Sequence, residues 1–83
     1  MLPIWKQYTR DELITAIHAN LTILISTSGI DGTLAIGRFE AWLETINRLW
    51  SSKKHSIRRK RTCEELAVSM KANGVRLSTE VVC

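Results

Sequence analysis

Apolar residues recur at helical spacing in two stretches of the chain. The first stretch runs from about Arg10 to Ser26, with isoleucines and leucines mostly three or four residues apart. The second runs from about Thr33 to Trp50 in steps of three, three and one. Because residues three or four apart lie on one face of a helix, each stretch predicts an amphipathic helix.

The polar residues at the ends of these stretches predict where the helices begin and how they are connected. Thr9 and Glu12 stand in a capping-box pattern at the start of the first helix. The segment from Ser26 to Gly32 is small, polar and contains two glycines, which suits a turn between antiparallel neighbours. Gly37 lies inside the second helix, where we expect it to allow a close approach of the first.

A third, shorter helix is predicted after residue 61. Thr62 and Glu65 repeat the capping-box pattern, and Gly74 suits the left-handed position that ends a helix. The remaining residues, 75–83, leave two alternatives open. Every second residue is apolar or β-branched, as in a strand, whereas Ser78 also suits the cap of a short final helix.

These elements predict an all-α protein: an antiparallel helical hairpin in residues 1–52, a basic connector in 53–61, and a short helix with a turn and tail in 62–83. A layer of two helices cannot hide all of the apolar side chains. We therefore expect a homodimer, or a hydrophobic face that docks on another protein. The expected interface residues are Trp5, Ile14, Ile17, Leu21, Trp42 and Trp50.

The distribution of charge separates the last third of the chain from the rest. The net charge is +4 over 83 residues, but residues 1–52 carry four basic and five acidic side chains, whereas residues 53–83 carry eight and three. Clustered cations attract nucleic-acid phosphates by releasing condensed counterions. The alternative is a solvated linker. The expected phosphate-binding residues are Lys53, Lys54, Arg58, Arg59, Lys60, Arg61 and Arg76.

The segment from Glu65 to Val82 loosely resembles a helix-turn-helix. The positions that carry the resemblance are Met70, Gly74, Val75, Ser78 and Thr79. It implies a second helix that reads base edges in the major groove of DNA. That helix would have only one or two turns before residue 83, which leaves little length for base contacts.

Other chemistry has little support in the sequence. No stretch is long and apolar enough to span a membrane, and no basic segment precedes an apolar run at the N-terminus, so we expect a cytoplasmic protein. Cys63 and Cys83 are then expected to be reduced thiols. His18 and His55 stand at no metal-ligand spacing, so we expect neither a metal nor a cofactor. No nucleophile with a neighbouring base is visible, and we expect no enzymatic activity.

The sequence thus favours a small nucleic-acid-binding regulatory protein that uses its Lys/Arg cluster on phosphates. The alternative is a small adaptor or inhibitor protein, of the kind found in phages and plasmids, that docks on a host protein without nucleic acid. An oligomeric structural component is a third possibility that the same hairpin would serve.

Overall fold

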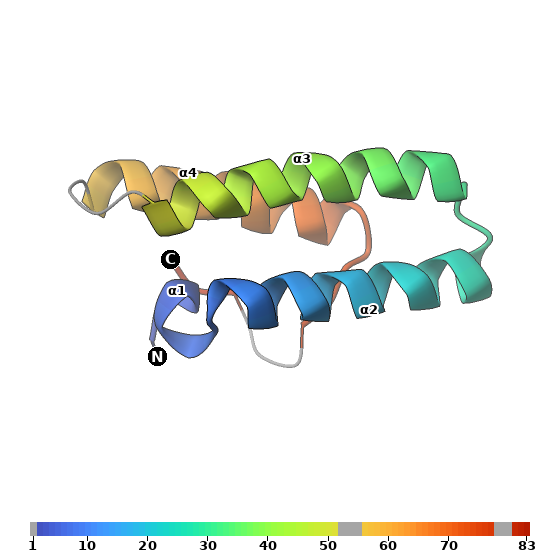
Figure 1. Cartoon of the computed structure of the whole chain (residues 1–83), viewed down its shortest axis with the longest axis horizontal. Coiled ribbons are helices and arrows are strands. Elements are labelled where there is room, and N and C mark those ends of the chain that lie inside the picture. Colours follow the sequence, from blue (N-terminus) through green and yellow to red (C-terminus); the bar gives the residue numbers. More distant parts are fainter. Residues whose placement is uncertain (1, 52–55, 78–80) are drawn as a thin grey trace.

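The computed structural model describes residues 2–51, 56–77 and 81–83. Within these ranges the chain forms four helices: α1 (Ile4–Gln7), α2 (Arg10–Ser28), α3 (Gly32–Ser51) and α4 (Ser56–Ala72). Figure 1 shows α2 and α3 running lengthwise and joined at one end, with α4 alongside α3. The prediction of an all-helical chain is confirmed for the described residues, which contain no strand.

Helix α2 begins with the predicted capping box. The backbone N–H of Glu12 donates to the Thr9 hydroxyl (3.1 Å), and the backbone N–H of Thr9 donates to the Glu12 carboxylate (2.9 Å). The helix continues two residues beyond the predicted end, because the residue that can adopt the left-handed stop is Gly29, with a φ of 66°. The loop to α3 is correspondingly shorter than expected.

Helix α3 is capped by Asp31, whose carboxylate accepts a hydrogen bond from the backbone N–H of Thr33 (2.8 Å). The expected role of Gly37 in this helix is wrong. No atom of another element lies within 4 Å of the place where a Cβ on Gly37 would stand. The glycine therefore faces open space, and the contact between α2 and α3 is made by other positions.

Helix α4 differs most from the sequence-based expectation, because it begins at Ser56 and includes residues 56–61 of the predicted connector. Like charges can be accommodated there because consecutive residues point about 100° apart around a helix. Thr62 is consequently inside the helix instead of capping it, and its hydroxyl donates to the carbonyl of Arg58 (2.9 Å). The predicted end is confirmed, since Gly74 has a φ of 79°.

The core lies where the four helices and the segment after α4 meet. Its buried members are Ile4, Leu13, Ile17, Leu21, Ala35, Trp42, Ile46, Leu49, Cys63, Leu66, Met70 and Val75. Helix α4 and Val75 thus cover apolar surface that the hairpin alone would leave open. Three residues expected at a protein interface, Ile17, Leu21 and Trp42, are interior residues of this chain. The other three, Trp5, Ile14 and Trp50, are half-buried and pack against the core.

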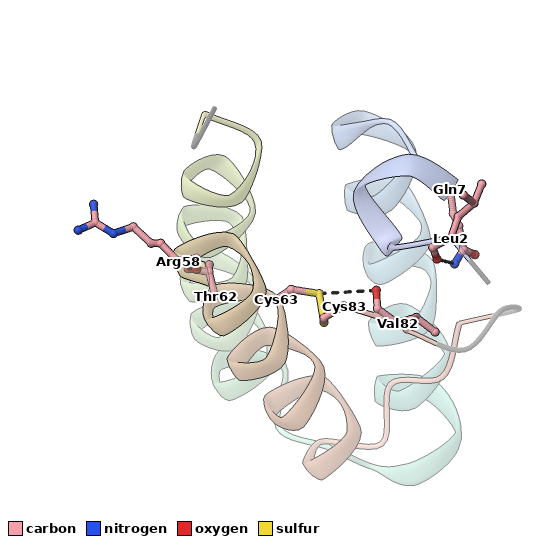
Figure 2. The surroundings of a disulfide bond; sticks show 7 residues. All are labelled: Leu2, Gln7, Arg58, Thr62, Cys63, Val82 and Cys83. Atoms are coloured by element: carbon pink, nitrogen blue, oxygen red, sulfur yellow. Dashed lines mark hydrogen bonds between the residues drawn. A yellow bond between two sulfur atoms is a disulfide. The ribbon is translucent and has the colours of Figure 1, made fainter. Parts of the chain in front are cut away.

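The last residues of the chain return to α1 and α4. Cys83 forms a disulfide with Cys63 of α4, with 5.8 Å between their Cα atoms. The expectation of two reduced thiols is therefore wrong, because α4 and the chain end bring the two sulfurs together. Figure 2 shows the disulfide between α4 and the side of the molecule that carries α1. The described residues after Gly74, 75–77 and 81–83, form neither of the two elements considered for them.

Candidate functional site

The basic run does not form a single charged stripe. Arg58, Lys60 and Arg61 are exposed, whereas Arg59 is half-buried. Lys53 and Lys54 lie outside the described residues, as does His55. Because the four described cations are consecutive in a helix, their side chains leave α4 in different directions. Figure 2 shows Arg58 extending away from the molecule on the side opposite to the disulfide.

Arg59 is held within the chain. Its guanidinium carbon lies 5.5 Å from the centroid of the Trp5 ring, in a cation–π arrangement. This contact joins α4 to α1. The structure thus separates Arg59 from its neighbours in the basic run, which point elsewhere. The sequence carries no local signal for this contact, since Trp5 is far from Arg59 along the chain.

Two of the other cations, Arg58 and Arg61, line hollows formed jointly by α3 and α4. Arg58 lines a shallow hollow together with Arg48 of α3. Arg61, three residues further along α4, lines a second hollow together with Arg38 of α3. We call these four residues, Arg38, Arg48, Arg58 and Arg61, the α3–α4 arginine surface. Arg38 and Arg48 were not expected here, because α3 on its own does not indicate where α4 will pack.

The guanidinium groups of this surface are open to solvent and to a ligand. All four residues are exposed. In the part of the chain that the structure describes, Arg38, Arg58 and Arg61 form no ion pair, and Arg48 donates to the Thr45 hydroxyl (3.4 Å). Two carboxylates belong to the same surface: Glu65 lines both hollows, and Glu64 lines the hollow of Arg38 and Arg61. The surface therefore carries two more positive than negative side chains.

Arg76 lies away from the arginine surface. Its backbone N–H donates to the side-chain oxygen of Asn20 on α2 (3.4 Å), and its side chain lines a hollow with Lys71. It follows the C-terminal end of α4, whereas Arg58 is in the first turn, about 20 Å away along the helix axis. The structure therefore does not bring Arg76 together with the cations of the basic run.

The helix-turn-helix resemblance extends only as far as the turn. Met70 and Val75 are buried in the core, and Gly74 adopts the left-handed conformation. Residues 75–77 and 81–83 are not helical, and Ser78 and Thr79 lie outside the described residues. No recognition helix is present among the described residues.

A group of exposed apolar side chains lies at the opposite end of the hairpin. Figure 1 shows that the connected ends of α2 and α3 extend past the C-terminal end of α4. We call the apolar residues exposed there the hairpin end: Ile23, Ile25, Leu34 and Ile36. They are 39–60% exposed. None of these four residues was among the interface residues expected from the sequence. The structure buries or half-buries all of the residues that were expected there.

The described residues show neither a metal-binding cluster nor a membrane-spanning helix. No group of three or more His, Cys, Asp or Glu side chains among them is arranged to hold a metal ion. His18 instead meets the ring of Phe39 edge to face, with 5.5 Å between ring centroids. None of the described helices combines the length and the apolar character needed to cross a bilayer.

The fold and the site were compared with known proteins in three ways. Neither protein-family models, nor curated proteins, nor solved structures yield a match to this chain.

Proposed function

We propose that this chain is a small nucleic-acid-binding regulatory protein that contacts phosphates through the α3–α4 arginine surface. The observation that supports this proposal is the convergence of two arginines from each of two helices on one side of the molecule. None of these four guanidinium groups has an ion-pair partner among the described residues. Guanidinium groups suit phosphate because their planar array of N–H donors matches its oxygen atoms.

The mechanism is electrostatic. Each arginine that contacts a phosphate releases counterions, so four contacts on duplex DNA predict a slope of about −3.6 in log K against log salt concentration. Glu64 and Glu65 repel phosphate, which places the backbone of the nucleic acid nearer to the arginines at the two ends of the surface. Because the described residues contain no recognition helix, we expect phosphate contacts and little dependence of binding on base sequence.

The test is a titration of a short labelled DNA duplex of mixed sequence, followed by fluorescence anisotropy at several salt concentrations. The double variant Arg58→Gln/Arg61→Gln should reduce the magnitude of the salt slope by about 1.8. The matched control, Lys6→Gln/Lys71→Gln, removes the same charge from exposed positions elsewhere and should leave the slope unchanged. An equal reduction of the salt slope in both variants would show that net charge alone attracts the DNA, which would refute a role of the arginine surface. Absence of binding at low salt would refute nucleic-acid binding altogether.

The hairpin end supports a second candidate from another class, a protein-binding adaptor or inhibitor. The observation behind it is that four large apolar side chains are exposed at this one end of the molecule, and exposed apolar surface marks protein contacts where it is contiguous. A pull-down from nuclease-treated lysate discriminates between the two candidates. A single stoichiometric protein partner that is kept by Arg58→Gln/Arg61→Gln and lost by Leu34→Ser/Ile36→Ser would favour the adaptor. Light scattering tests the homodimer, whose mass would be twice the 9.4 kDa of one chain.

A further inference from the structure

The end of helix α4 forms a Schellman motif, which turns the chain back toward the helix. The backbone N–H of Gly74 donates to the carbonyl of Lys71 (3.1 Å), and that of Val75 donates to the carbonyl of Met70 (3.0 Å). Gly74 supplies the left-handed conformation that this motif requires. Because Met70 and Val75 are both buried, the segment that follows α4 starts from the core.

This segment is tied to other parts of the fold at three points. The backbone N–H of Arg76 donates to the side-chain oxygen of Asn20 on α2 (3.4 Å). The carbonyl of Val82 accepts a hydrogen bond from the backbone N–H of Ile4 (2.9 Å), and the disulfide joins the last residue to α4. Figure 1 shows the segment leaving the end of α4 toward α2 and the chain ending near α1. The described residues of the segment are thereby held in place relative to α4.

A hollow of about 560 Å³ lies between α4 and this segment, and its volume is in the range of small-molecule binding sites. Most of its lining is apolar. Helix α4 contributes Ala67 and Met70, and the segment contributes Val75, Leu77 and Val81. The two hollows of the arginine surface are instead lined mainly by charged and polar residues. The hollow beside the segment therefore suits the hydrocarbon part of a ligand.

Two cations also line this hollow, Lys71 in the last turn of α4 and Arg76 in the segment. Both residues are exposed, and neither forms an ion pair within the part of the chain that the structure describes. The described lining contains no carboxylate. The carbonyls of Met70 and Lys71 accept the hydrogen bonds of the Schellman motif, which reduces their repulsion of an anion. The described lining thus combines an apolar surface with two cations that lack a local counter-charge.

We propose that this hollow binds a small amphipathic anion. Its hydrocarbon tail lies against the apolar lining, and its carboxylate or phosphate head group pairs with Lys71 and Arg76. A guanidinium group binds either head group through paired N–H donors, so the chemistry that the hollow recognises is a set of anionic oxygen atoms on an apolar chain. The site is independent of the proposed nucleic-acid binding, because its lining shares no residue with the hollows of the arginine surface.

Octanoate and octyl phosphate are the probes that test this site. Each is titrated into the full chain below its micelle concentration, and binding is followed by NMR of backbone amides and methyl groups. Saturable shift changes should centre on Ala67, Leu77 and Val81. Octanol, which lacks the anionic head, and acetate, which lacks the tail, should bind at least about tenfold more weakly.

Saturable binding of either probe at these residues supports the site, and a preference for one of them assigns the head group. Absence of saturable binding for both probes would overturn the proposal. Shift changes centred on the hairpin end would also overturn it, because the probe would then only cover exposed apolar surface.

Matched variants test the two parts of the lining separately. Arg76→Gln should weaken binding of the probe about tenfold through loss of a charge-assisted pair, whereas Arg38→Gln removes the same charge from an exposed position on α3 and should have no effect. Ala67 is half-buried in the wall, so Ala67→Leu should fill the hollow and abolish saturable binding. Ala19→Leu, at an exposed position of α2, should leave binding unchanged. Equal effects within either pair of variants would refute the site.

Discussion

The indole N–H of Trp42 donates a hydrogen bond to the hydroxyl of Ser69, with 2.9 Å between the nitrogen and the oxygen. Trp42 is 3% exposed and lies on α3, whereas Ser69 lies on α4. A buried indole N–H requires an acceptor, so this bond favours one register of α4 along α3. That register in turn brings the arginines of the two helices to the same side of the molecule.

Replacing Ser69 with Ala should therefore destabilise the fold. The change leaves the indole N–H of Trp42 buried without an acceptor, which costs about 1–3 kcal/mol. Urea denaturation followed by tryptophan fluorescence measures the loss. Ser26→Ala is the matched control, since Ser26 is exposed and its hydroxyl bonds only to carbonyls of its own helix. Equal effects of the two substitutions would contradict the importance of this hydrogen bond.

Reduction of the disulfide should lower the free energy of unfolding. Cys63 and Cys83 are 20 residues apart, and in the chain-entropy model closure of such a loop contributes about 3 kcal/mol. The denaturation midpoint should fall when reductant is added to the wild type. Cys83→Ser provides the control, because its midpoint should match that of the reduced protein and should not respond to reductant. Identical midpoints for oxidised and reduced wild type would show that the bridge does not stabilise the fold.

The capping box of α2 should make part of the stability depend on pH. The hydrogen bond from the Thr9 backbone N–H, followed by the one that involves the Thr9 side chain, lowers the pKa of Glu12 below its ordinary value of 4.5. Because the pKa is lower in the folded state, this contribution is present above the unfolded pKa and is lost as the pH falls through the folded pKa. The difference in stability between wild type and Glu12→Gln should therefore shrink in acid.

Denaturation curves measured between about pH 7 and about pH 2 test this dependence. The same carboxyl-to-amide change at Glu40, which is exposed on α3 and belongs to no capping box, serves as the control. A stability difference for Glu12→Gln that is constant over this range would contradict the prediction. A direct NMR titration should place the midpoint of the Glu12 carboxyl below 4.5.

Two glycines should respond to alanine with opposite signs. Gly74 has a φ of 79°, which L residues with a side chain adopt only at a cost, so Gly74→Ala should destabilise the fold by about 1–2 kcal/mol. Gly37 is inside α3 and faces open space, so Gly37→Ala should stabilise it by up to about 1 kcal/mol. Thermal unfolding measures both changes. The same sign for both variants would mean that backbone conformation does not decide the outcome.

Local sequence patterns determined the three longer helices and several of their ends, whereas the short helix α1 was not predicted. The capping box of Thr9 and Glu12 and the stop at Gly74 were predicted because they involve residues within a few positions of one another. The same reasoning was wrong for Thr62, where an equally good capping pattern lies inside a helix. Packing of α4 on α3 and the link to Cys83 favour continuation of the helix there.

The partner of each helix face was decided only by the tertiary structure. Periodicity shows that Trp42 lies on an apolar face, but it does not show whether that face meets α4 or a second chain. In the same way, the basic run does not indicate that Arg59 packs on Trp5 or that Arg38 and Arg48 join its other members. Hydrogen bonds and side-chain spacing within one helix are local in the sequence, whereas these contacts join residues that only the folded chain brings together.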